Sequence, residues 1–267
     1  MMKIGFIGLG NMGGSLARLV AQDERFRSEL LLANRSRNKA EKIAAEVGGQ
    51  PVSNEEVFSR AEVIFLGIKP AQFADLLAEY QEILEKRESL LLVSMAAGLP
   101  LKTLKKLVPS HHRWIRIMPN TPVAVGEGVI TYSLSQQANQ VDEDLLRELL
   151  SSAGLLVKLE EKQLDAATAL AGCGPAFVYL FIEALADAGV QAGLSRDMSL
   201  ELANQTLLGA AKLSQISGQH PAQLKDQVCS PAGSTIAGVA SLEENAFRGT
   251  VMDAVQAAYQ RTQELGK

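Results

Sequence analysis

The first residues most restrict how this chain can fold, because a glycine-rich turn joins an apolar segment to an amphipathic one. Residues 3–7 have the pattern of a strand, the turn Gly8-Leu9-Gly10-Asn11-Met12-Gly13 follows, and residues 12–21 repeat with helical spacing. In such a unit the glycines permit a tight turn, close approach of a pyrophosphate, and close helix–strand packing. The free N–H groups at the helix start favour an anion. The turn predicts a dinucleotide site rather than a glycine-rich turn without a ligand.

The rest of the first part alternates apolar runs with amphipathic segments. We predict strands at 3–7, 30–33, 62–68, 90–94 and 114–118, and helices at 12–21, 37–47, 71–84 and 101–107. Strands that are apolar at nearly every position are typical of a parallel sheet buried on both faces. The alternation predicts an α/β domain with a doubly wound sheet of the Rossmann type over residues 1–160.

The second part, residues 161–267, differs in composition. It holds 20 alanines and 7 Lys/Arg against 11 Asp/Glu, so it carries the whole net charge of −4. Helical spacing predicts helices from Pro175 to about Gly193 and from about 196 to 216. Residues 241–244 resemble a capping box that opens a further helix, which Gly249 would interrupt. So many apolar positions favour an all-helical domain that packs against a second copy of the chain over one that packs alone.

Composition and charge exclude several classes of protein. With 21% charged residues, 2 cysteines and no block of like charges, the chain is neither disordered nor stapled by disulfides, and no nucleic-acid partner is expected. The longest apolar stretch noted, 90–99, is too short to span a membrane, and no signal peptide is expected at the start. Cys173 and Cys229 form no CxxC motif, so no metal site is expected. His111 and His112 are predicted at the surface, and the cytoplasm is the expected compartment.

The residues after the second predicted strand bear on the choice of cofactor. An NAD site usually places an acidic residue there, whereas this chain has Asn34-Arg35-Ser36-Arg37 and no acid before Glu41. Guanidinium groups and neighbouring polar side chains would hold a ribose 2′-phosphate. The sequence therefore favours NADP(H), with NAD(H) kept as an alternative cofactor and solvated arginines as the alternative without a ligand.

Further candidate loops follow the carboxyl ends of the predicted strands, where ligands bind in open α/β sheets. They are 67–70, 94–98 and 118–122, and the helical part adds 172–175 and 230–235. The last of these offers hydroxyls and backbone N–H groups suited to a carboxylate. No Ser–His–Asp arrangement or cluster of metal ligands is present in the sequence. The residues alone therefore indicate an NADP-dependent reductase or dehydrogenase with a helical second domain.

The same motifs resemble those of pyrroline-5-carboxylate reductases, and the match runs nearly end to end. It is carried by residues 7–13, 68–70, 94–98, 118–122, 172–177 and above all 224–238, Leu-Lys-Asp-Gln-Val-Cys-Ser-Pro-Ala-Gly-Ser-Thr-Ile-Ala-Gly. The resemblance implies that NADPH reduces the C=N bond of 1-pyrroline-5-carboxylate to L-proline, the last step of proline biosynthesis. It also implies a homodimer through the helical domain, with the active site at the junction, and in some members a decamer of five dimers.

The resemblance also implies roles for particular residues. The substrate carboxylate would bind the backbone N–H groups of Ser234 and Thr235, beside Ser230 and Gly233, and the Thr235 hydroxyl would reach the ring nitrogen as the catalytic hydrogen-bond partner and candidate proton donor. Glu161 matches a position near the substrate. The cofactor side comprises Gly8, Gly10, Asn11, Met12, Gly13, Asn34, Arg35, Ser36, Arg37, Asn54, Gly67, Ile68, Lys69, Pro70, Ala97 and Gln227.

Three positions depart from the family pattern. Cys173 replaces the usual serine, Ala232 replaces a glycine, and Gln227 stands where some members have asparagine. A side chain at residue 232 resists positive φ.

Two other functions remain as alternatives to the reductase. A β-hydroxyacid dehydrogenase needs a lysine on the first long helix of the second domain, and residues 175–193 contain none. A non-catalytic NADP-binding sensor or partner protein would not need the 230–235 loop.

Overall fold

The structure is a computed structural model and describes residues 2–265. It divides into two compact units: a sheet unit, which runs to Cys173 and takes in the end of the chain from Ala258, and a helical unit, Gly174–Ala257. The domain boundary that we predict between residues 160 and 161 stays a proposal. Residues 1, 266 and 267 of the predicted domains lie outside the described residues.

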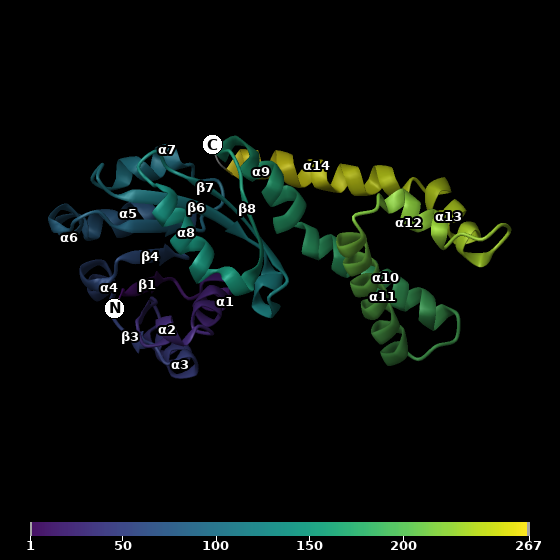
Figure 1. The fold of residues 1–267 in the computed structure, drawn as a ribbon, viewed down its shortest axis with the longest axis horizontal. Helices are drawn as coiled ribbons and strands as arrows, with labels where there is room; N and C mark the ends of the chain where they lie inside the picture. The colour runs from purple at the N-terminus through teal and green to yellow at the C-terminus, as the bar shows by residue number, and fades with distance from the viewer. Residues whose placement is uncertain (1, 266–267) are drawn as a thin grey trace. The chain divides into compact units, whose positions relative to one another are not determined.

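The sheet unit is built on one eight-stranded sheet in the order β3-β2-β1-β4-β5-β6-β7-β8 (Figure 1). The strands are β1 Ile4–Ile7, β2 Leu30–Ala33, β3 Gln50–Pro51, β4 Val63–Leu66, β5 Leu91–Ser94, β6 Arg113–Pro119, β7 Gly128–Leu134 and β8 Gly154–Lys158. All neighbouring pairs are parallel except β6 with β7. The chain order reverses between β1 and β4, and such a switch point is where doubly wound sheets bind their ligands.

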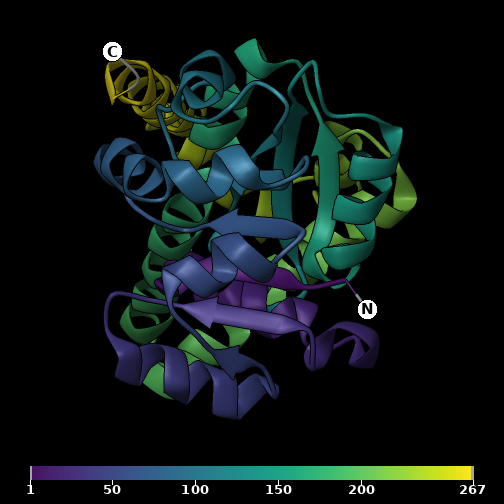
Figure 2. The ribbon, with the colours of Figure 1, turned by 90° about the vertical axis from the view of Figure 1, so that its left-hand side faces the viewer.

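Helices cover both faces of this sheet (Figure 2). The α-helices of the unit are α1 Asn11–Val20, α2 Glu24–Arg27, α3 Arg37–Val47, α4 Asn54–Arg60, α5 Phe73–Glu79, α6 Gln81–Lys86, α7 Leu101–Leu104, α8 Gln140–Leu149 and α9 Leu164–Ala167. Short 3₁₀ turns lie at Pro70–Gln72, Lys105–Leu107, Thr121–Val125, Ser151–Ala153 and Glu161–Gln163, and a π-helical turn at Thr168–Gly172 follows α9.

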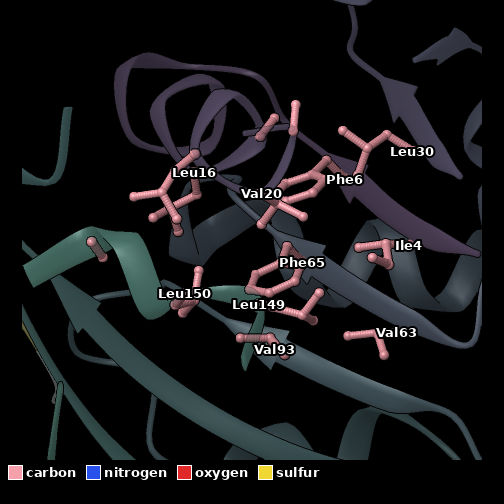
Figure 3. Packing of buried hydrophobic residues seen from close by; sticks show 14 of the residues in the cluster. Ile4, Phe6, Leu16, Val20, Leu30, Val63, Phe65, Val93, Leu149 and Leu150 are labelled. Carbon is pink, nitrogen blue, oxygen red and sulfur yellow. The ribbon is translucent and has the colours of Figure 1, made fainter. Parts of the chain in front are cut away.

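The core consists of two apolar clusters that take alternate residues from the strands. Phe6 and Phe65 stack with ring centroids 4.7 Å apart in the cluster that includes α1 (Figure 3). Ile7 and Ile64 belong to the other cluster, which includes Trp114. Because both faces of the central strands are covered, those strands are buried at every position, as the uninterrupted apolar runs predict.

The helical unit contains α10 Gly174–Gln191, α11 Arg196–Ser217, α12 Pro221–Gln227, α13 Ser234–Glu244 and the first part of α14 Phe247–Leu265. An apolar groove of about 270 Å³ lies between α10 and α14, where the rings of Phe181 and Phe247 approach to 5.7 Å. Its lining residues are Phe177, Leu180, Phe181, Ala184, Phe247, Thr250, Val251 and Ala254. This is the all-helical second domain that the sequence predicts.

Several expectations for the helical part need correction. Residues 241–244 end α13 instead of opening a helix, and α14 runs through Gly249 without a break. The break lies at Ala246, which has a φ of +54° and separates the two helices.

Residues 90–99 are not the stretch that best fits a membrane span. By length and composition the helical stretch Glu161–Gln191 meets that test, with a mean hydropathy of 1.7. One such helix is weak support for a membrane protein.

Candidate functional site

The glycine-rich turn after β1 is shaped by two close backbone contacts. Gly8 has a φ of +89°, and a Cβ there would lie 2.6 Å from the Gly67 carbonyl oxygen. A Cβ on Gly13 would lie 2.1 Å from the carbonyl oxygen of Gly8. Gly10 differs, because a Cβ there would meet nothing within 4 Å. Packing therefore requires glycine at residues 8 and 13, whereas the space at Gly10 is open to a ligand.

The start of α1 presents donors to that open space. Its N-cap, Gly10, has no side chain to cap the helix, and its first turn contains no acidic residue. The first backbone bond returns from Gly14 N to the Gly10 carbonyl, 2.9 Å away. The N–H groups of Asn11 and Met12 thus remain for an anion, which the helix dipole also favours. The local geometry fits a pyrophosphate.

The segment after β2 joins the turn through an asparagine. The Asn34 Oδ1 atom accepts from Leu9 N at 3.0 Å, and its Nδ2 atom donates to the Ser36 carbonyl at 3.2 Å. Arg35 and Ser36 are exposed, and Arg37 pairs with Glu41 at 3.0 Å while its side chain stays 85% exposed. Asn34 therefore shapes the turn, and the side chains of Arg35 and Arg37 are exposed beside it.

Two cavities flank this segment. One of about 230 Å³ is lined by Asn34, Arg37, Ala40, Pro51, Val52, Ser53 and Glu56. The predicted cofactor residue Asn54 follows Ser53 directly, at the start of α4. The other cavity, of about 350 Å³, is lined by Leu9, Gly10, Asn11, Ser15, Arg18, Lys39, Lys42 and Ile43. Lys39 and Lys42 escaped the sequence analysis, although their spacing on one face of a helix was a usable signal.

Two more predicted cofactor loops lie at the same sheet edge. Gly67 follows β4, and a Cβ there would lie 2.5 Å from the Gly8 carbonyl oxygen, which brings the ends of β1 and β4 together. Ile68 is half-buried, whereas Lys69 and Pro70 beside it are exposed. Ala97, in the loop after β5, is also exposed. The structure thus brings the glycine-rich turn and the segment that begins at Gly67 together at one edge of the sheet.

Glu161 belongs to a polar cluster of the sheet unit, in which the Arg116 side chain is buried and that of Glu161 is half-buried. Its Oε1 atom accepts from Leu101 N at 2.6 Å and lies 3.5 Å from Arg116 Nη1. Arg116 Nη2 lies 3.3 Å from Asp165 Oδ1. The carboxylate that we expect near the substrate is therefore engaged by groups of its own unit. Neither Arg116 nor Asp165 was predicted as a site residue from the sequence.

The predicted carboxylate loop lies in the helical unit, ahead of α13. Ala232 adopts a φ of +58°, and a Cβ on Gly233 would lie 2.3 Å from Ser230 Oγ. Ser234 and Thr235 form the first turn of α13, are exposed, and have no acidic neighbour in that turn. Their N–H groups and hydroxyls suit a small carboxylate. Gln227 instead bonds Gln219, with Nε2 2.9 Å from Oε1.

His112 is a buried residue of the sheet unit. His112 is only 2% exposed, so its predicted surface position is wrong; it accepts from Leu90 N through Nδ1 at 3.1 Å, and Nε2 bonds the Leu84 carbonyl at 3.0 Å. Burial lowers its pKa to about 4. Cys173 and Cys229 are free thiols. Within residues 2–265 no group of His, Cys, Asp and Glu could hold a metal ion.

Two family models and several named relatives match this chain. Residues 161–265 match the domain described as pyrroline-5-carboxylate reductase dimerisation, and residues 3–98 match the one described as NADP oxidoreductase coenzyme F420-dependent. The pyrroline-5-carboxylate reductase of Pisum sativum is 45% identical over 98% of this chain and 95% of its own, and that of Glycine max is 46% identical over the same shares.

Solved structures give the same result. The crystal structure of Plasmodium falciparum pyrroline carboxylate reductase with NADP bound has a TM-score of 0.88 and 37% identity, and covers 100% of this chain and 98% of that one. A Coxiella burnetii pyrroline-5-carboxylate reductase has a TM-score of 0.91 at 30% identity, covering 100% and 99%. The chain belongs to the pyrroline-5-carboxylate reductase family.

Proposed function

We propose that this chain catalyses the NADPH-dependent reduction of 1-pyrroline-5-carboxylate to L-proline. The observation that carries the proposal is the pairing of two sites in one chain: a dinucleotide turn with an open position at Gly10, and a carboxylate loop ending in Ser234 and Thr235. Relatives that match nearly the whole chain are named pyrroline-5-carboxylate reductase.

On the cofactor side, the first turn of α1 holds the pyrophosphate, and Arg35, Ser36 and Arg37 hold the 2′-phosphate, with Asn34 keeping the segment in place. Asn54 and Ala97 complete the contacts, and Gln227 is proposed on the same side. NADPH supplies the hydride when bound. NAD(H) is the weaker alternative, because β2 ends without an acidic residue for a free 2′-hydroxyl.

On the substrate side, the N–H groups of Ser234 and Thr235 hold the carboxylate, with Ser230 and Gly233 shaping the loop. The Thr235 hydroxyl orients the ring nitrogen and donates a hydrogen bond or proton to it. A protonated imine is already electrophilic, so positioning supplies most of the catalysis and no separate acid–base pair is needed. Glu161 is proposed near the substrate, with its carboxylate engaged by the Leu101 N–H group and by Arg116.

The assay follows loss of NADPH absorbance with pyrroline-5-carboxylate, beside a 3-hydroxyacid with NADP as the control for a β-hydroxyacid dehydrogenase. We expect turnover with the first alone. NADPH binding without turnover of either would instead support the non-catalytic sensor.

Arg35→Ala and Arg37→Ala test the cofactor assignment. Loss of a guanidinium that contacts the 2′-phosphate should weaken the binding of NADPH and leave the binding of NADH unchanged, because only NADPH carries that phosphate. Equal losses for the two cofactors, measured by titration, would refute it.

We further propose that the chain forms a homodimer in the cytoplasm, with a decamer of five dimers as the alternative assembly. Sedimentation tests the assembly, and cell fractionation tests the compartment.

A further inference from the structure

The ion pairs of Arg116 contribute little to the stability of the fold. Arg116 lies in β6 with its side chain 4% exposed, and its Nε atom has no hydrogen-bond partner among the described residues. Its two ion pairs are long, at 3.5 Å to Glu161 and 3.3 Å to Asp165. A buried charge with an unsatisfied donor and long ion pairs gains little against the cost of desolvation. Its presence calls for another explanation.

Glu161, which Arg116 contacts, also forms a hydrogen bond with the start of α7. Glu161 Oε1 accepts from the backbone N–H of Leu101, 2.6 Å away and sixty residues earlier in the chain. Leu101 is the first residue of α7, and its N-cap, Pro100, supplies no side-chain cap. Glu161 therefore takes the place of a capping residue, and its negative charge also favours the helix start.

The capped residue ends the loop that follows β5. In this loop, residues 95–100, the backbone N–H of Met95 donates to the Leu66 carbonyl at 3.3 Å. Gly98, further along the loop, has a φ of +70°. At its start the loop lies at the edge where Gly67 approaches the Met95 side chain, and it carries the exposed Ala97. The loop is thus fixed at its first residue by β4 and just after its last by Glu161.

We propose that Arg116 is a positioning residue: by orienting Glu161 it caps α7 and holds the 95–100 loop in the conformation that meets the cofactor. The inference rests on the proposed cofactor contact of Ala97. It assigns the effect of Glu161 to the loop and not to direct contact with the substrate. Arginine suits the place because its planar fork spans both Glu161 and Asp165, whereas an ammonium group is a single point charge.

The experiment compares Arg116→Met, Glu161→Ala and Glu161→Gln with the full-length wild type. The readouts are NADPH affinity by fluorescence titration without substrate, thermal unfolding without ligand, and the KM for each substrate. Lys102→Met, an exposed position on α7, is the control. Wild-type NADPH binding and turnover are measured first, so a failure of the proposed function is seen separately.

We expect Arg116→Met and Glu161→Ala to weaken NADPH binding roughly tenfold, the effect of losing about one hydrogen bond to the cofactor. The unfolding temperature of Arg116→Met should stay near that of the wild type, because Glu161 and Asp165 are 31% and 32% exposed and can be solvated. Glu161→Gln should retain most of the NADPH affinity, because its amide oxygen can still accept from Leu101.

Two results would overturn the proposal. If Glu161→Gln raises the KM for pyrroline-5-carboxylate while NADPH affinity stays unchanged, Glu161 contacts the substrate directly. If Arg116→Met and Glu161→Ala lower the unfolding temperature and leave NADPH affinity intact, the cluster is structural. Should Arg116→Met fail to fold, the two Glu161 variants decide by themselves.

Discussion

At the residue scale, Thr235 carries the most specific chemistry. Its hydroxyl lies in the exposed first turn of α13, away from any acidic neighbour in that turn. We predict that Thr235→Ala lowers kcat by one to two orders of magnitude, about the size of one lost hydrogen bond at a reacting centre, and leaves NADPH affinity unchanged. Thr235→Ser keeps the hydroxyl and should retain most of the activity. Wild-type turnover in Thr235→Ala would refute the assigned role.

The glycines of the phosphate turn should respond in opposite ways to alanine. Gly13→Ala forces a Cβ against the Gly8 carbonyl, so the free energy of unfolding should fall by about 1–3 kcal/mol. Gly10→Ala meets open space, so stability should hold while the dissociation constant for NADPH rises about tenfold or more. Denaturant unfolding and cofactor titration on both variants check this contrast. Loss of stability in Gly10→Ala would contradict it.

Ala232 occupies a backbone conformation that costs an L-residue about 1–2 kcal/mol, with a φ of +58°. Ala232→Gly relieves that strain and adds flexibility to the unfolded chain, so we expect a gain of a few tenths to about 1 kcal/mol in the free energy of unfolding. Ala237→Gly, inside α13, is the matched control and should destabilise by about 0.5–1 kcal/mol. A loss of stability in Ala232→Gly would contradict the strain argument.

At the scale of elements, the sequence predicts those whose signal is local. The helix Arg37–Val47 and the strand Leu30–Ala33 agree with the predicted ends. Three strands were missed. Two of them give weak signals, because β3 has two residues and β8 is an edge strand with Leu155 55% exposed. The third, β7, is mostly buried and contains the β-branched run 129–131, so its signal was overlooked. The break at Ala246 was missed because alanine rarely adopts positive φ.

The sites follow the same rule. The phosphate turn was predictable because its strand, turn and helix are consecutive. The cap that Glu161 places on α7 was not, since the acceptor and the donor are sixty residues apart and only the folded sheet brings them together. Arg116 was missed for the same reason: an arginine within an apolar strand gives no indication of its partners.

His112 links the end of α6 to the strand start of β5 as a neutral ring, bonding the Leu84 carbonyl and Leu90 N. Its pKa is lowered from 6.5 to about 4, chiefly by burial. Between those values the unfolded chain binds the proton and the folded chain does not, so this contribution to stability is complete above pH 6.5 and is lost as the pH falls toward 4.

The free energy of unfolding, measured from pH 7 to pH 4, should therefore fall more steeply in the wild type than in His112→Gln. His111→Gln is the control, because His111 is exposed. Parallel slopes for the wild type and His112→Gln would contradict the role of this ring.

At the scale of the whole molecule, the helical unit exposes more apolar surface than a monomer ordinarily presents. Leu180, Leu208, Leu213 and Met252 are each between 58% and 71% exposed. Leu180 also lines the apolar groove between α10 and α14, and contiguous apolar surface of this kind marks an interaction site. We expect a second copy of the chain to cover the groove between α10 and α14.

Leu180→Lys and Val251→Lys, on the groove, should raise the dimer dissociation constant at least about tenfold, because each removes a buried apolar contact and buries a charge. Val141→Lys, 72% exposed on α8, is the control and should leave the dimer intact. Sedimentation over a range of protein concentrations measures the change. Unaltered dimers in both groove variants would place the interface elsewhere.

The open space at Gly10 also bears on how such chains diverge. Selection for folding alone would keep Gly8 and Gly13, whose missing side chains the backbone itself requires, and would leave residue 10 free to drift. A descendant that lost its cofactor would therefore keep the outer glycines of the turn and lose the middle one. Residue 10, and not the full motif, would then record whether a chain of this fold still serves a dinucleotide.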